Sequence, residues 1–208
     1  MFDLKHQIEG LSLFPLGMTL FPCGILSLNI FEPRYLSMIK RHYERGEPFG
    51  VVTLLEGSEV KLPEQSNKLA NFGTLAKIIE FQAVQPALYR IKCVGWSRFE
   101  IKQRLSQLAG VERADVLLLP EDAPVSVSAD LQDVANTLGQ LIAQNQERGV
   151  KLNEFPFTQP FCLDEAGWVA NRWAELLGLV SEERVSLLAQ RDPALRLQRI
   201  KDLMDQPT

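Results

Sequence analysis

The phrase Phe-Pro-x-Gly occurs twice near the start of the sequence, at residues 14–17 and 21–24, and the second copy holds a thiol, Cys23. A thiol in a glycine-containing loop is a candidate nucleophile. A catalytic cysteine needs a partner that lowers its pKa, and no such partner stands near Cys23 in the sequence. We therefore expect Cys23 to be a small, half-buried turn residue. The alternative, a small hydrolase built on Cys23, requires His42 or a carboxylate within hydrogen-bond distance of the sulfur.

The other histidine and cysteine side chains fit structural roles. The sequence contains two histidines: His6 lies near the start, and His42 lies near the end of an expected helix, where a cation complements the helix dipole. Cys93 falls inside an expected strand and Cys162 follows a phenylalanine, so we expect both to be buried. Because no Cys-x-x-Cys pair is present, the sequence indicates neither a zinc site nor a disulfide framework.

The common catalytic motifs are absent from the sequence. It has no Gly-x-x-x-x-Gly-Lys-Ser/Thr, no Gly-x-Gly-x-x-Gly after a strand, no His-Glu-x-x-His and no Gly-x-Ser-x-Gly. Adjacent acids occur at Glu182-Glu183, at an expected helix start, and at Glu121-Asp122, in an expected linker. We therefore expect a protein with no catalytic residues, no metal and no cofactor.

Composition and charge further limit the classes of protein to which the sequence could belong. Of the 208 residues, 46% are hydrophobic and 23% are charged, as in ordinary globular proteins, and the length suits one large or two small domains. The net charge of -4 argues against binding to nucleic acid. Asp3, Lys5 and Glu9 interrupt the start where a secretory signal needs an apolar run, and no segment approaches the ~20 apolar residues of a membrane span. We expect a soluble, cytoplasmic protein without membrane contact.

From Leu11 to about Pro120 the apolar residues mostly alternate with polar ones or form short runs, which is typical of strands. Their regular spacing favours a barrel or sandwich with mostly antiparallel pairing. One helix should interrupt this part, beginning at Pro33 and ending before Gly46, and lie against the sheet. Trp96 and Arg98 are expected in a turn. The expected strands are residues 26–30, 49–55, 73–83, 88–94, 99–101 and 111–119.

Residues 123–208 show helical periodicity instead. Three or four amphipathic helices of this length would form a small bundle. The sequence therefore predicts an α+β protein with a β-rich subdomain at residues 1–122 and a helical subdomain at residues 123–208. The expected residues at the helix starts are Ser126 or Ser128, Asp164, Ser181, and Asp192 followed by Pro193.

Two features could bind a partner. Trp96 and Arg98 could anchor a peptide. The turn-rich loop with Phe155, Phe157 and Phe161 must either pack on the core or dock a partner, and we favour packing, since exposed apolar patches on monomers are uncommon. If these residues bind, we expect an apolar groove between the two subdomains that is bordered by some of them.

The string LFPLGMTLFPCGILSLNIFEPRYLSMI closely resembles the opening of the N-terminal domain of the Lon ATP-dependent proteases, and FGVV, FGTLAKIIEF and IKCVGWSRFEI resemble its middle. The helical half resembles the tail of short, stand-alone bacterial members that lack the ATPase and protease modules. We expect the matching positions to be structural. They are Phe14, Pro15, Gly17, Phe21, Pro22, Phe31, Glu32, Pro33, Arg34, Tyr35, Gly73, Gly95, Arg98 and Phe99.

Some positions depart from the family pattern. Cys23 stands where glycine is common in the second turn, and Asn29 stands where a basic residue is usual. Gln85-Pro86-Ala87 replaces an expected Asp-Gly hairpin turn. These departures put the shapes of the local turns in question, and leave the resemblance intact.

The resemblance implies a fold and a role. The fold is a PUA-like β pseudo-barrel followed by a helical bundle, and the role is that of a non-catalytic module that binds unfolded or peptide segments of client proteins. Such a module could act as an adaptor for a separate protease or chaperone. With an end at Thr208, we expect no room for an ATPase module. The alternative is an RNA-binding PUA-like protein, which would need a basic face of Lys40, Arg41 and Arg45 joined by Lys68 or Lys77.

Overall fold

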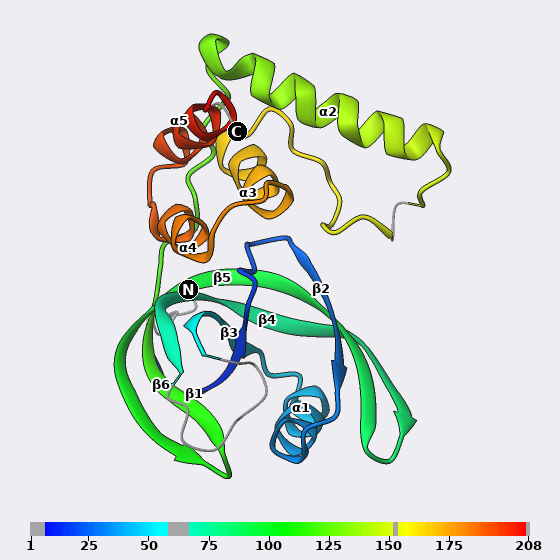
Figure 1. The fold of residues 1–208 in the computed structure, drawn as a ribbon, viewed down its shortest axis with the longest axis vertical. Coiled ribbons are helices and arrows are strands. Elements are labelled where there is room, and N and C mark those ends of the chain that lie inside the picture. The colour runs from blue at the N-terminus through cyan, green and yellow to red at the C-terminus, as the bar shows by residue number, and fades with distance from the viewer. Residues whose placement is uncertain (1–6, 58–66, 152–153, 207–208) are drawn as a thin grey trace, which may run out of the picture.

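The computed structural model describes residues 7–57, 67–151 and 154–206. Its strands are β1 (Gln7–Leu16), β2 (Ile25–Ile30), β3 (Phe49–Glu56), β4 (Lys68–Gln85), β5 (Leu88–Leu108) and β6 (Val111–Leu118). Its helices are α1 (Pro33–Arg45), the 3-10 turn η1 (Ala129–Leu131), α2 (Gln132–Glu147), α3 (Ala166–Leu176), α4 (Ser181–Ala189) and α5 (Pro193–Met204). The strands and α1 form one half of the molecule, and α2 to α5 gather on the other (Figure 1). The predicted α+β class is confirmed.

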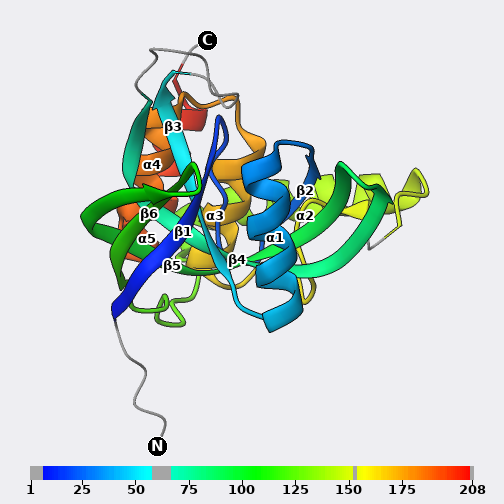
Figure 2. The same ribbon diagram turned by 90° about the horizontal axis from the view of Figure 1, so that it is seen from below.

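The strands close into a barrel. The sheet order is β2-β5-β4-β3-β1-β6, and β5 also pairs with β6, which closes β5, β4, β3, β1 and β6 into a ring with β2 paired to the outside of β5. β1 and β3 are parallel, and the other pairs are antiparallel. The length of β5 allows this closure, because Phe99 lies opposite both Gly73 of β4 and Leu118 of β6. In Figure 2, turned by 90°, the strands and α1 lie in front of the other helices.

Trp96 and Arg98 lie inside β5, so the predicted turn at this point is wrong. The cause is an irregularity in the pairing: Gly95 faces Ala76 and Arg98 faces Thr74, so Trp96 and Ser97 together stand opposite a single residue of β4. An extra residue of this kind makes a β-bulge, which redirects the side chains around it. Trp96 consequently points outward and is 53% exposed, while Arg98, two residues later, is only 4% exposed.

The predicted helix at Pro33 is confirmed, with both of its ends. Gly46 follows the last turn with a φ of 65°, a left-handed conformation that suits glycine. At the other end Arg34 forms an ion pair with Glu32 at 2.9 Å and donates a hydrogen bond to the carbonyl of Gly110 at 3.1 Å. The Glu-Pro-Arg segment thus fixes the helix start against the hairpin between β5 and β6.

Some of the helices in the second half begin where the sequence predicts, and others do not. α5 begins as predicted, since the carboxylate of Asp192 accepts hydrogen bonds from two backbone amides at 2.8 and 3.2 Å, and α4 begins at Ser181. Asp164 does not cap α3, which begins at Ala166 after Glu165. Ser128 precedes the 3-10 turn η1 instead of an α-helix. Within the described ranges, no helix is both long enough and apolar enough to cross a membrane.

The two Phe-Pro segments belong to different hydrophobic cores, and the first of them lies in the last residues of β1, where Phe14 and Pro15 pair with β3. Phe14 packs with α1 and the strands beneath it, where Tyr35 lies with its ring centroid 4.3 Å away. Phe21, which is fully buried, packs among the helices of the second half. A third core fills the barrel around Phe99 and Leu13. The second turn therefore inserts a side chain of the barrel half into the bundle.

Gly95 is predicted to be required where β5 passes the second turn. A Cβ at this position would lie 2.1 Å from the carbonyl oxygen of Phe21, so Gly95→Ala must push the turn away from the strand. We expect the free energy of unfolding, measured by urea denaturation, to fall by about 2 kcal/mol. Gly178→Ala is the matched control, because nothing lies within 4 Å of the added carbon. Equal effects of the two substitutions would contradict the assignment.

Candidate functional site

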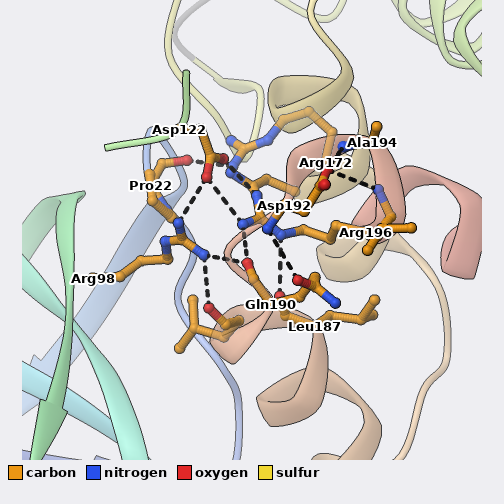
Figure 3. A network of polar contacts seen from close by, with 12 residues as sticks. Pro22, Arg98, Asp122, Arg172, Leu187, Gln190, Asp192, Ala194 and Arg196 are labelled. Carbon is orange, nitrogen blue, oxygen red and sulfur yellow. Dashed lines mark hydrogen bonds and ion pairs between the residues drawn. The ribbon is translucent and has the colours of Figure 1, made fainter. Parts of the chain in front are cut away.

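A shared carboxylate joins the two halves of the molecule. Asp122, in the segment after β6, contacts Arg98 of β5 at 2.7 Å and Arg196 of α5 at 2.5 and 3.0 Å (Figure 3). The side chains of Arg98 and Arg196 are 3% and 0% exposed. Because both cations are removed from water, the single anion between them is essential to their burial.

Backbone carbonyls satisfy the remaining donors of these two arginines. Arg98 donates to the carbonyls of Leu188 and Gln190 at 2.9 and 2.7 Å, and Arg196 donates to those of Leu187, at 3.1 Å, and Gln190. These acceptors lie at the C-terminal end of α4 and just after it. Burial, with the nearby charge of Arg196, lowers the pKa of Arg98 to about 10. The network ties β5 to the region between α4 and α5.

A second buried pair holds the Phe-Pro turn at residues 21–24. Arg172 of α3 donates to the carbonyl of Pro22 at 2.6 Å and forms an ion pair with Glu175 at 3.2 Å. Glu175 in turn accepts a hydrogen bond from the amide of Phe21 at 3.2 Å. Burial raises the pKa of Glu175 to about 7, against the opposing effect of Arg172. α3 therefore forms hydrogen bonds with the backbone of two successive residues of this turn.

The aromatic loop is packed into the same junction. Phe155 and Phe157 are 5% and 3% exposed and belong to the bundle core, and Phe161 packs against that core while partly exposed. Hydrogen bonds of 2.7 and 2.9 Å join Pro156 and Thr158 of the loop to the chain on either side of Gly24. Phe155 and Phe157 therefore pack on the core, as the sequence analysis favours, and they border a pocket with residues of β2, β4 and β5 that is separate from the surroundings of Trp96.

A cleft of about 310 Å³ opens between the barrel and the bundle, and Asp122 and Arg98 of the network form part of its lining. Its lining includes Trp96 and Arg98 of β5, Cys23 of the second turn, Glu165 and Trp168. Arg98 contributes a guanidinium group that is already neutralised and nearly covered. Of the five predicted binding residues, Trp96 is the one that offers a large exposed apolar surface here.

The candidates for catalysis are not brought together. Cys23 is exposed at the cleft, whereas His42 lines a different pocket between α1 and β1. Cys23 adopts a φ of 64°, which accounts for the glycine expected at this position, and its backbone pairs with Gly95 and Thr158. Cys93 is buried as predicted, and burial raises its pKa to about 12. His6 lies outside the described residues.

Metal binding has no candidate in the described part of the chain, where no group of three or more histidine, cysteine and acidic side chains could hold an ion. His42 lies near the end of α1 as expected, but it is buried, and burial lowers its pKa, which disfavours the cation that would complement the helix dipole.

The sequence does not reveal the buried charges at the junction of barrel and bundle. Its local pattern places Asp122 in a linker and does not distinguish Arg172 and Arg196 from other charged residues. A signal was present, since Arg172 lies within the predicted apolar helix between Trp168 and Trp173. A charge inside such a stripe indicates a buried partner elsewhere in the fold.

Comparison with known proteins identifies relatives of this architecture. The sequence model of the ATP-dependent protease La (LON) substrate-binding domain matches residues 10–206. The crystal structure of a Lon N-terminal domain protein from Xanthomonas campestris has 27% identical residues and a TM-score of 0.74, covering 96% of this chain and 100% of that one. The N-terminal domain of the Lon protease of the Mycobacterium avium complex, 15% identical with a TM-score of 0.57, shares the fold over the same fractions.

Curated relatives match over part of their length. Cereblon of Danio rerio is 29% identical over 121 residues, which are 56% of this chain and 27% of that protein. Lon protease 4 of Sorangium cellulosum is 26% identical over 190 residues, which are 89% of this chain and 22% of that protein. The chain therefore spans about a quarter of the length of these relatives. The resemblance seen in the sequence is confirmed.

Asp122→Asn should destabilise the protein, because it leaves two buried guanidinium groups without their anion. We expect the free energy of unfolding to fall by about 3 kcal/mol in urea denaturation at pH 7. Asp133→Asn is the control: it removes the same charge from an ion pair with Lys201, in which Asp133 is 67% exposed, and should have a much smaller effect. If the two variants lose similar stability, the network does not hold the halves together.

The raised pKa of Glu175 predicts a dependence of stability on pH. Between about pH 4.5 and 7 the folded protein holds a proton on this carboxyl that the unfolded chain releases, so its contribution to stability is lost as pH rises through this window. Glu175→Gln keeps the acceptor for Phe21 and cannot titrate. The unfolding free energy of the variant should therefore decline less between pH 5 and 7.5 than that of the wild type. Parallel curves would show that Glu175 is ionised throughout.

Proposed function

The chain belongs to the family of LON substrate-binding domains, and from this premise we propose that it is a non-catalytic module that binds unfolded or peptide segments of other proteins. Membership of a family of substrate-binding domains supports a binding role. The relatives are Lon protease and cereblon, and their names specify no client for this chain. We further propose that it acts as an adaptor, which presents such segments to a separate protease or chaperone.

The observation that carries the proposal is the exposure of Trp96 at the cleft between barrel and bundle. An indole that is 53% exposed beside a cleft of about 310 Å³ offers apolar surface, and its N–H can pair with a peptide carbonyl. Aromatic side chains in preformed hollows commonly supply the largest share of binding energy at protein interfaces. Trp168 also lines the cleft, and its indole N–H has no acceptor among the described residues.

The walls of the cleft support binding because they are held in place before a ligand arrives. Trp96 stands on a strand that pairs on both sides of the bulge, and the Asp122 network fixes that strand to α4 and α5. Binding to a preorganised surface avoids the entropy cost of ordering it. The described side chains also offer no nucleophile paired with a base at this cleft, which supports a binding role over a hydrolase that uses Cys23.

The RNA-binding alternative has less support. Three of its basic residues lie within ion-pair distance of carboxylates: Lys40 with Glu44 at 3.9 Å, Arg45 with Glu47 at 4.0 Å, and Lys68 with Glu56 at 2.6 Å. Lys68 lies next to β3, whereas Lys40 and Arg45 lie on α1. These pairs reduce the positive field that binding to a phosphate backbone requires.

Trp96→Ala should weaken the binding of unfolded polypeptide. The probe is a carboxymethylated, permanently unfolded model protein labelled with a fluorophore, titrated with the chain in an anisotropy assay. We expect the dissociation constant to rise at least about tenfold, because truncation removes the main apolar anchor. The half-exposed position of Trp96 should leave the fold intact, which circular dichroism checks.

Val180→Ala is the matched control for this titration. Val180 is 66% exposed and precedes α4, outside the lining of the cleft, so its truncation should leave the affinity unchanged. Failure of the wild type to bind the probe at low salt would contradict the proposed function. Equal affinity of Trp96→Ala and the wild type would contradict the placement of the site.

A further inference from the structure

A second pocket, on the barrel, has a different chemistry from the cleft. It measures about 350 Å³ and lies between α1, the first residues of β1, and β6. Its lining includes Arg41 and His42 of α1, Ser12 of β1 and Arg113 of β6. The pocket shares no lining residue with the cleft at Trp96. The two pockets are therefore distinct.

Two arginines lie in this pocket without a carboxylate partner among the described residues. Arg41 donates a hydrogen bond to the hydroxyl of Ser12 at 3.3 Å, and Arg113 donates one to the carbonyl of Gly10 at 3.3 Å. These contacts place both guanidinium groups beside the same short stretch of β1. Each retains further N–H donors, whose planar arrangement matches the oxygens of a carboxylate or phosphate.

His42, which lines the pocket, contributes a buried polar atom without a partner among the described residues. The residue is 6% exposed, and its Nε2 has no hydrogen-bond partner among the described residues. Its Nδ1 lies 3.3 Å from the carbonyl oxygen of Glu47, which can only accept, so Nδ1 carries the proton and Nε2 presents a lone pair. A buried polar atom without a partner is costly unless something fills the position.

The C-terminal end of a helix repels an anion through its unpaired carbonyl groups, and this repulsion is reduced at the end of α1. The amides of Gly46 and Glu47 cap the carbonyls of Tyr43 and His42 at 3.2 and 3.0 Å, which satisfies the free acceptors there. Of the acids in the lining, Glu47 lies 4.0 Å from Arg45. Glu9 is exposed at the rim.

We propose that this pocket binds a small oxyanion, a phosphate or carboxylate group, between Arg41 and Arg113 with His42 at its inner side. The arginines donate hydrogen bonds to the anion. Nε2 then forms a hydrogen bond with an oxygen of the ligand. The proton in this hydrogen bond comes from the ligand or from solvent. Binding therefore favours the protonated imidazole over the neutral one.

The test follows the imidazole of His42 by ¹H–¹⁵N NMR in phosphate, in acetate and in chloride at equal ionic strength, with His42→Gln to assign its signals. Without ligand, burial and the charge of Arg41 lower the pKa of His42, against the carbonyl and charge of Glu47, while Arg45, Arg113 and Glu9 also face the pocket. Phosphate or acetate at saturation should raise this pKa by about 1. Identical titration curves in all three salts would overturn the proposal.

Arginine variants test where the anion sits. Arg41→Gln and Arg113→Gln should each weaken the binding of the anion about tenfold or more, since each removes charged hydrogen bonds. Arg148→Gln removes the same charge after α2, outside the pocket, and should leave binding unchanged. Equal weakening by all three variants would show a general effect of net charge and overturn the assignment. Circular dichroism confirms that each variant is folded.

Discussion

One carboxylate between two buried guanidinium groups is the interaction on which the arrangement of the two halves depends. Asp122 neutralises Arg98 of the barrel and Arg196 of the last helix at once. Either cation alone would be costly to bury, and two adjacent cations would also repel each other. The carbonyls at the end of α4 and just after it complete the coordination, so the strands, the helices and the segment between them meet at one point (Figure 3).

The second Phe-Pro turn extends this junction and shapes the cleft above it. Phe21 enters the bundle core, and Arg172 and Glu175 hold the backbone on either side of it. Gly95 lets β5 pass close to the turn, and the bulge that follows directs Trp96 outward. The exposed indole is therefore a consequence of how barrel and bundle are joined, which links the proposed binding surface to the stability of the fold.

Local signals in the sequence were sufficient for the class and for most element starts. Proline and glycine bounded α1, and Asp192 capped α5, because these depend on neighbours in the chain. The bulge at Trp96 was missed because it depends on pairing with a distant strand. The candidate site was predictable through Trp96 and Arg98, whereas the shared carboxylate was not, since Asp122 lies 24 residues from Arg98 and 74 residues from Arg196.

The indole N–H signals of the three tryptophans test the central claim most directly. Trp96 and Trp168 line the cleft, whereas Trp173 is buried and donates a hydrogen bond to Val134 at 3.1 Å. Addition of an unfolded polypeptide to the ¹⁵N-labelled chain should move or broaden the Trp96 signal most, affect Trp168 next and leave Trp173 in place. Binding that leaves the Trp96 signal unchanged would contradict a polypeptide site at the junction of barrel and bundle.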